Sequence, residues 1–194
     1  MEKNNLNLEY HRYLKSYSLI GKIYKKYFLH KFLLKHSGYD FLDVGCGLGN
    51  FLSLGSEKAL GLDINEYNVK YIKTKGLKAK LIPKDGIFPL RDRSYNSIVC
   101  DQVLEHIPDP TLFLNEINRV IKSPGQLILG LPLEMGYKAD KDHCSFYTPK
   151  KAIKLIERNT RLAHQRTIYY PFPLKIFGKF FKQQFFYLLF NTLS

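Results

Sequence analysis

Short apolar runs alternate with longer amphipathic stretches along most of this sequence. The apolar runs, which we expect to be strands, occupy residues 39–44, 58–62, 78–82, 97–101, 126–131 and 161–170. The amphipathic stretches between them predict helices at residues 50–55, 65–75, 110–121 and 149–159. Strands separated by helices of this length form parallel sheets with right-handed crossovers. The pattern therefore predicts an α/β fold, in which a doubly wound, mostly parallel sheet with flanking helices forms a single domain.

The two ends of the chain differ from this core in composition. Residues 1–38 are typical of one or two basic amphipathic helices ended by Gly38, and we expect them to form an N-terminal cap. Residues 39–170 would form the core. Residues 171–194 are rich in Phe and Leu, and their lysines recur at helical spacing, which predicts a C-terminal amphipathic helix with one face carrying Lys175, Lys179 and Lys182.

Residues 42–50 (Leu-Asp-Val-Gly-Cys-Gly-Leu-Gly-Asn) contain the most informative motif of the chain. An apolar strand runs into three alternating glycines, Gly45, Gly47 and Gly49, and Asp43 precedes them. Glycines permit a tight turn and let a ligand approach the backbone. A turn from strand to helix also aims free backbone N–H groups at a polar ligand. The spacing differs from the G-x-G-x-x-G of dinucleotide sites, and the acid in front suits a cationic ammonium group.

This block resembles motif I of the class I S-adenosylmethionine-dependent methyltransferases, which have a Rossmann-like fold. The resemblance implies that S-adenosylmethionine is the cofactor. A second acid, Asp63, ends an apolar run eighteen residues after Gly45. In a doubly wound sheet this acid lies beside the first glycine-rich loop, so we expect it to bind the ribose hydroxyls. Its alternative role is to cap the helix that begins near Asn65.

Later segments resemble the same family. Asp85-Gly86 corresponds to the segment in which an acid accepts a hydrogen bond from the adenine amino group, although it is also favourable turn chemistry. Glu105-His106, within 102–110, resembles the Leu-Glu-His stretch of a broad small-molecule subgroup, and 143–149 resembles a later stretch ending in Phe-Tyr-Thr-Pro. The resemblance implies that the cofactor-binding residues are Asp43, Gly45, Cys46, Gly47, Gly49, Asp63, Ile64, Asp85, Gly86 and Gln102.

Methyl transfer from a sulfonium is an in-line displacement, so the protein must chiefly align the two partners and exclude water. A base is needed only where the acceptor is a hydroxyl or another weak acid. His106 and His143 are the candidate catalytic residues, because both follow strands at the edge where open α/β sheets bind ligands. We expect methylation of a small-molecule or lipid-linked acceptor, with O-methylation favoured. An inactive methyltransferase-like binding module and an NAD(P)-dependent oxidoreductase are the alternatives.

Glu105-His106 also resembles part of a divalent-cation site in the quinone-ring O-methyltransferases of ubiquinone synthesis. Those enzymes have an acid three residues before the Glu, where this chain has Gln102. An uncharged amide is a poor substitute for a carboxylate on a hard cation. The sequence therefore predicts that no metal is bound.

The net charge of +13 is concentrated at the two ends. Residues 1–38 carry +6, residues 39–157 carry +1 and residues 158–194 carry +6. Cationic ends around a neutral core suggest an anionic partner. A basic, Phe-rich C-terminal helix suits an anionic membrane surface; the alternative is that it packs on the protein or on a second copy in a homodimer. Nucleic acid is not expected, because Arg-rich patches are missing.

Three cysteines, Cys46, Cys100 and Cys144, are too few and too far apart for a disulfide framework or a zinc motif. The first residues lead into no short apolar signal core, and no run of 18 or more uncharged apolar residues occurs. We therefore expect a cytoplasmic protein, peripheral at the membrane where the C-terminal helix binds there.

Overall fold

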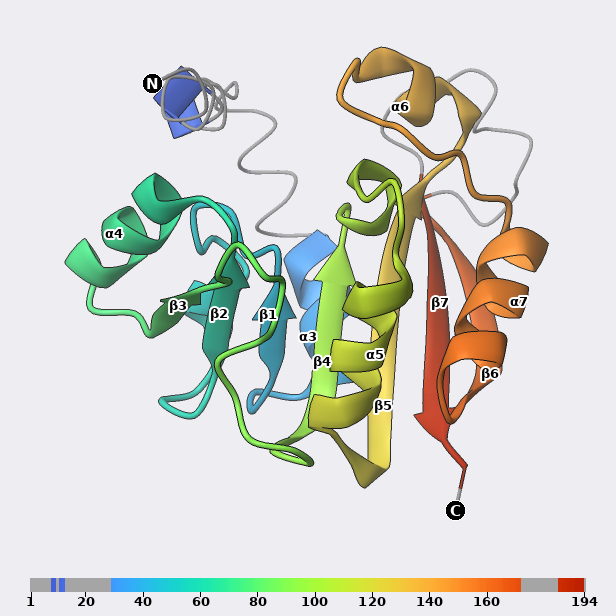
Figure 1. Cartoon of the computed structure of the whole chain (residues 1–194), viewed down its shortest axis with the longest axis horizontal. Coiled ribbons are helices and arrows are strands. Elements are labelled where there is room, and N and C mark those ends of the chain that lie inside the picture. The colour runs from blue at the N-terminus through green and yellow to red at the C-terminus, as the bar shows by residue number, and fades with distance from the viewer. Residues whose placement is uncertain (1–7, 10, 13–28, 172–184, 194) are drawn as a thin grey trace. The chain divides into compact units, whose positions relative to one another are not determined.

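The computed structural model describes residues 8–9, 11–12, 29–171 and 185–193 (Figure 1). The chain divides into two compact units, residues 1–89 and residues 90–194.

The first unit contains three parallel strands in the order β3-β2-β1. Every residue of β1 and β2 is buried, as expected for parallel strands covered on both faces. Gly38, with a φ of 69°, ends the first described helix by donating its N–H to the carbonyl of Leu34. The elements are α3 (His30–Ser37), β1 (Leu42–Val44), the 3₁₀ helix η2 (Leu52–Leu54), β2 (Leu60–Asp63), α4 (Glu66–Thr74) and β3 (Ala79–Leu81).

The second unit contains four strands in the order β4-β5-β7-β6. Strand β4 is parallel to β5, whereas β7 is antiparallel to both β5 and β6. The elements are β4 (Tyr95–Asp101), the 3₁₀ helix η3 (Leu104–His106), α5 (Thr111–Val120), β5 (Ile121–Pro132), α6 (Glu134–Ala139), α7 (Pro149–Asn159), β6 (Leu162–Tyr170) and β7 (Phe185–Thr192).

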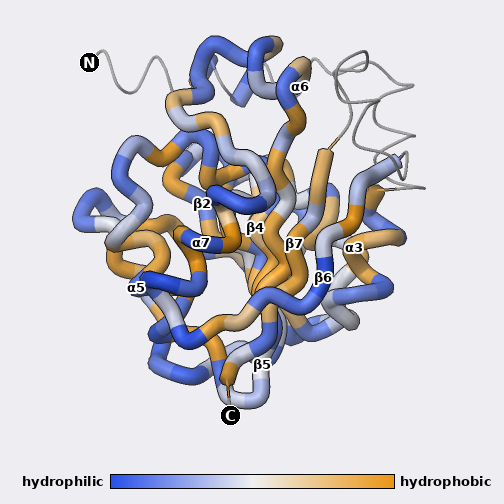
Figure 2. Tube along the Cα trace, turned by 90° about the vertical axis from the view of Figure 1, so that its right-hand side faces the viewer, coloured by the Kyte–Doolittle hydropathy of each residue, from blue (hydrophilic) through white to orange (hydrophobic). Residues whose placement is uncertain are grey.

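Strand β7 shows that the expected C-terminal helix is wrong for residues 185–192. Its apolar run is continuous (Figure 2), and the side chains of Phe186, Tyr187, Leu188 and Phe190 are fully buried. A strand covered on both faces has such an unbroken apolar sequence, which periodicity alone does not distinguish from a buried helix. The aromatic residues expected to meet a membrane are therefore core residues in this part. The rest of the prediction, including Lys175, Lys179 and Lys182, lies outside the described residues.

Three further elements differ from expectation. The helix expected at 50–55 is only the single turn η2, and the strand expected at 126–131 begins at Ile121. The polar loop expected to run to Thr148 contains α6. Of the expected N-terminal helices, the structure describes α3 and helical residues at 8–9 and 11–12.

Helices α4, α5 and α7 confirm the predicted helices of the core, and two of them begin at side-chain caps. The Asn65 side chain accepts from the backbone N–H of Tyr67, and the Thr148 side chain accepts from that of Lys151. The predicted α/β class is confirmed: the strands of the first unit are parallel, and the second unit joins the parallel pair β4 and β5 to the antiparallel strands β7 and β6. Among the described residues, no helix has both the length and the apolar character needed to cross a bilayer.

Candidate functional site

The glycine loop after β1 is fixed against the carbonyl end of β2. The backbone N–H groups of Gly45 and Cys46 both donate to the carbonyl of Leu62, at 2.8 and 3.0 Å. Gly47 and Gly49 have φ values of 54° and 71°, a left-handed conformation that residues with a Cβ rarely adopt. The alternating glycines are therefore required by the turn itself, and they leave its backbone open to a ligand.

Asp63, at the end of β2, is tied directly to this loop. Its Oδ2 accepts the N–H of Gly47 at 2.8 Å, and its Oδ1 accepts the N–H of Asn65 at 2.8 Å. Burial raises the pKa of Asp63, and these N–H groups act in the opposite direction. The alternative role as helix cap is wrong, because the cap of α4 is Asn65. Asp63 and the glycine loop thus form one preorganised unit, as a ribose site requires.

Two further buried residues, Asn68 and His11, hold the Asp63 side chain in position through hydrogen bonds. Asn68, fully buried on α4, donates from Nδ2 to Asp63 Oδ2 at 3.4 Å. Its Oδ1 lies 2.8 Å from Nδ1 of His11, a buried histidine of the N-terminal segment whose ring meets that of Tyr71 edge-on. Sequence analysis missed both His11 and Asn68, since they lie 57 residues apart and neither stands in a motif.

Cys46 occupies the space beneath the loop as a packing residue. Burial first, and then the carboxylates of Asp43 and Asp63, raise the pKa of its thiol, so the thiol stays protonated. A Cβ placed on Gly61 of β2 would come within 2.6 Å of the Cys46 sulfur. Asp43, on β1, is itself buried beside this thiol and pairs in register with Gly61.

The remaining candidates of the first unit differ in exposure. Ile64 is 73% exposed directly after Asp63, which leaves an apolar side chain open to a flat ligand group. Asp85 accepts the N–H of Ile87 at 3.0 Å, and Gly86 has a φ of 78°. The turn role of Asp85-Gly86 is thus present, and the adenine role stays a prediction.

In the second unit, Gln102 follows β4 in a strained conformation. Its φ is 58°, which is uncommon for a residue other than glycine and is often held in place at functional sites. Its backbone N–H donates to the carbonyl of Gly130 at 3.0 Å. Its side-chain Nε2 is buried and has no hydrogen-bond partner among the described residues, so this amide is available to a ligand.

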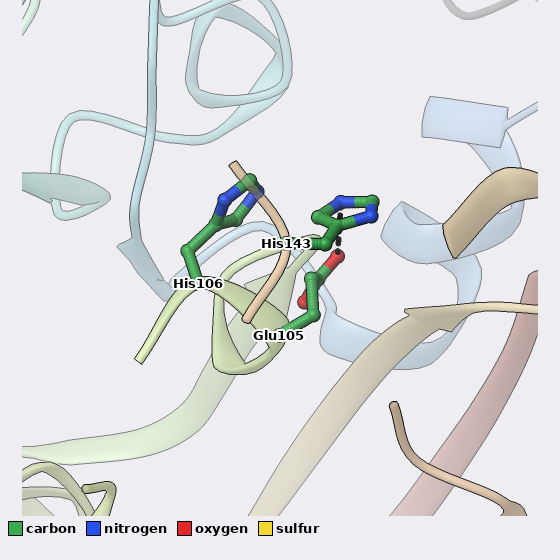
Figure 3. Close-up of side chains that lie close together, drawn as sticks. All are labelled: Glu105, His106 and His143. Carbon is green, nitrogen blue, oxygen red and sulfur yellow. Dashed lines mark ion pairs between the residues drawn. The ribbon is translucent and has the colours of Figure 1, made fainter. Parts of the chain in front are cut away.

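Glu105, His106 and His143 lie together in the same unit, close to the carboxyl end of β4 (Figure 3). Glu105 is 0% exposed, and neither of its carboxylate oxygens has a hydrogen-bond partner among the described residues. Burial raises the pKa of Glu105 to about 8, and the charges of Asp101 and Asp140 act in the same direction. Burying a carboxyl group that has no hydrogen-bond partner lowers the stability of the folded state. Glu105 is therefore a candidate functional residue.

His143 is oriented by the helix that sequence analysis missed. Its Nδ1 lies 2.8 Å from the carbonyl oxygen of Tyr137 on α6, and its ring stacks on the Tyr137 ring with centroids 5.3 Å apart. Its Nε2 faces Glu105 Oε1 at 3.8 Å, which is longer than a hydrogen bond. The loop that carries His143 is attached to η3, because Cys144 and Ser145 donate their backbone N–H groups to the carbonyl of Glu105.

His106 completes the cluster from η3. Its Nδ1 lies 3.2 Å from the carbonyl oxygen of Asp142, and its ring centroid lies 4.7 Å from that of His143. Burial, and then the neighbouring His143, lower the pKa of His106 and so favour its neutral form. The structure therefore brings the two candidate catalytic histidines together, as the sequence did not predict.

The comparisons with known proteins agree with this arrangement. Residues 42–129 match a family model described as a methyltransferase domain. A probable S-adenosylmethionine-dependent methyltransferase of Mycolicibacterium smegmatis is 26% identical over 110 residues, which cover 55% of this chain and 43% of that protein. A ubiquinone biosynthesis O-methyltransferase of Bordetella parapertussis is 27% identical over 101 residues, which cover 47% and 42%. The chain spans about half or less of the length of the curated relatives it matches.

Among solved structures, a SAM-dependent methyltransferase from Archaeoglobus fulgidus superposes with a TM-score of 0.65 at 15% identity. The match covers 90% of this chain and 100% of that one, and it shows a shared fold. S-adenosylmethionine is the cofactor of this type of domain. The glycine loop with its tied acid, both in the first unit, has the chemistry to hold this cofactor.

Proposed function

We propose that this chain, which carries a class I S-adenosylmethionine-dependent methyltransferase domain, transfers a methyl group to a small-molecule or lipid-linked acceptor, and that the acceptor atom is oxygen. The hydrogen bond from the Gly47 N–H to Asp63 supports the donor half of this proposal most directly. It couples the glycine turn to the acid that would bind the ribose, so that both are in place before the donor arrives.

The reaction needs no covalent intermediate with the protein. The sulfonium makes the methyl group electrophilic, and the acceptor displaces the thioether in line. In this proposal Asp43 and the glycine loop hold the amino-acid part of the donor, Asp63 holds the ribose, and Ile64 covers the base.

If the acceptor atom is oxygen, the cluster of Glu105, His106 and His143 can take part in proton transfer. A hydroxyl must lose its proton as it attacks, and a neutral imidazole can accept that proton. His143 is held with one ring nitrogen on the Tyr137 carbonyl, which leaves Nε2 to act. The name of the Bordetella parapertussis relative, an O-methyltransferase of ubiquinone biosynthesis, is consistent with this acceptor class.

The decisive experiment is a transfer assay without a preselected acceptor. Small-molecule and lipid extracts are incubated with isotopically labelled S-adenosylmethionine and either the wild-type protein or Asp43→Ala. Labelled product that forms only with the wild type supports the proposal, and its structure identifies the acceptor atom. Saturable donor binding by calorimetry without any labelled product would support the inactive-module alternative, and spectroscopic binding of NADH would support the oxidoreductase.

A further inference from the structure

We propose that Glu105, His106 and His143 form a binding site for one divalent transition-metal ion of the zinc type. The three side chains each offer one ligand atom, and these atoms lie within 4.8 Å of one another. A tetrahedral zinc ion with bonds of roughly 2.0–2.1 Å requires ligand atoms about 3.3 Å apart. Small side-chain rotations are therefore enough to close the three groups around an ion.

Both histidines are oriented as metal ligands are. A carbonyl oxygen can only accept a hydrogen bond, so Nδ1 of His143 must carry the proton it gives to Tyr137, and Nδ1 of His106 the proton it gives to Asp142. In neutral imidazole this leaves the Nε2 lone pair of each ring free to bind a cation. Ligand histidines in metal sites are held in this way by their second nitrogen.

The carboxylate of Glu105 gives a second, independent reason to expect a bound cation. Glu105 is fully buried, yet neither oxygen has a hydrogen-bond partner among the described residues. Nε2 of His143 lies 3.8 Å from Glu105 Oε1, with its lone pair facing the carboxylate. A cation between the two groups would satisfy both, which no proton position does at this separation.

The backbone keeps the two contributing segments together. Cys144 and Ser145 donate to the carbonyl of Glu105 at 2.9 and 3.1 Å, so the loop carrying His143 is fixed to the residue that carries the carboxylate. The site thus does not depend on closure of a free loop.

Two imidazole nitrogens and one carboxylate oxygen select the type of ion. This set suits zinc and related transition metals, whereas Mg²⁺ prefers oxygen ligands. The expectation of no metal rested on Gln102 as a poor ligand for a hard cation. The site proposed here does not use Gln102, and takes His143 from a loop 41 residues further along the chain instead.

Three protein ligands leave a fourth position open on a tetrahedral ion. With the ion bound, the Nε2 lone pairs of His106 and His143 are ligands and no longer bases. In a role that rests on the proposed function, the ion would then replace the imidazole base, because an acceptor hydroxyl at this open position would lose its proton more easily.

The test measures metal binding alone. Chelator-treated protein is titrated with Zn²⁺ by calorimetry, and with Co²⁺ by absorption spectroscopy. We expect one saturable Zn²⁺ per chain, no comparable binding of Mg²⁺, and a Co²⁺ spectrum without a thiolate charge-transfer band. Glu105→Gln, His106→Asn and His143→Asn should each weaken Zn²⁺ binding by about 100-fold or more. Cys144→Ser and His164→Asn, a thiol and an imidazole of the same unit outside the ligand set, should bind as the wild type does.

Imidazole nitrogen shifts keep the test independent of how the variants fold. In the wild type, Zn²⁺ should move the Nε2 resonances of His106 and His143 and leave that of His164 in place. Absence of a one-per-chain site, unchanged affinity in the three ligand variants, or a thiolate band from Cys144 would overturn the proposal. None of these readouts uses donor or acceptor, so a failure of methyl transfer leaves the result on the metal unaffected.

Discussion

The hydroxyl of Tyr187 donates a hydrogen bond of 2.9 Å to Asp101 across the width of an intervening strand. Asp101 ends β4 and Tyr187 lies on β7, and both pair in register with Gly130 of β5. A Cβ on Gly130 would collide with the Asp101 carboxylate and with the Tyr187 ring. The absence of a side chain at Gly130 is therefore what lets the tyrosine reach the end of β4, next to the residues that lead into η3.

This relationship predicts the order of two stability losses. Tyr187→Phe removes one hydrogen bond to a carboxylate and should lower the free energy of unfolding by about 1.5–3 kcal/mol. Gly130→Ala should cost more, because the ring, the carboxylate or the strand must move. Urea denaturation measures both, and a smaller loss in Gly130→Ala would contradict the packing described.

The donor site is tested by two substitutions with a matched control. Asp43→Ala and Gly47→Val should each abolish S-adenosylmethionine binding, since one removes the carboxylate for the ammonium group and the other fills the donor's space. Gly76→Val imposes the same left-handed strain, with a φ of 75°, at a position where a Cβ has open space. Calorimetric titration should show normal affinity in Gly76→Val. Wild-type affinity in either site variant would refute the assignment.

Asn68 and His11, which hold Asp63 in position, should affect the affinity for the methyl donor. Asn68→Ala removes the amide that holds the carboxylate, and His11→Ala removes the partner of that amide. Each loss is worth about 0.5–1.5 kcal/mol, or roughly 2- to 10-fold in the dissociation constant. Lys70→Ala, an exposed neighbour on α4, is the control and should bind the donor normally.

The histidines should affect turnover more than donor binding. With a hydroxyl acceptor, His143→Ala or His106→Ala should lower the rate by roughly 10²- to 10⁴-fold with little change in donor affinity. Single-turnover rates and donor titrations on the same samples separate the two effects. Unchanged rates in both variants would indicate an acceptor that needs no protein base.

Glu105 should make the stability of the metal-free protein depend on pH. Its folded pKa of about 8 lies above the ordinary value of 4.5, so between these values the folded state holds a proton that the unfolded chain has lost. Stability from this group therefore falls as pH rises through that window. Glu105→Gln removes the effect. Urea unfolding in the presence of a chelator measures this. Between about pH 5 and about pH 8.5, the free energy of unfolding of Glu105→Gln should rise relative to that of the wild type. A difference between the two proteins that does not change with pH would contradict this.

The sequence predicted those parts of the fold that depend on local pattern. Helix α4 has its Asn65 cap and its amphipathic face, and the glycine loop needs the left-handed turns that only its residue types allow. The position of Asp63 beside the glycine loop was also predicted, because the length of one helix-containing crossover sets the spacing between them.

What was missed depends on contacts distant in sequence. The Phe-rich run of β7 became a strand because β5 and β6 pair with its two edges, and an unbroken apolar run does not encode its own partners. The pairing of His143 with Glu105 depends on α6 and on two backbone hydrogen bonds from the following loop. No periodicity in the sequence signals such bonds.

The position of β7 also determines how the second unit can be assembled. Among the described strands, β6 pairs with β7 alone, although β6 comes first in the chain. On the ribosome, β6 therefore emerges before the strand it pairs with, and the native order β5-β7-β6 forms only after β7 has been inserted between β5 and β6. The pairing of β5 with β7, in which Gln126 meets Asn191, is distant in sequence. Such pairings slow folding and leave strand edges open meanwhile. Native pairing of this half should thus wait for residues 185–192, and synthesis interrupted before them should leave a chain prone to aggregate.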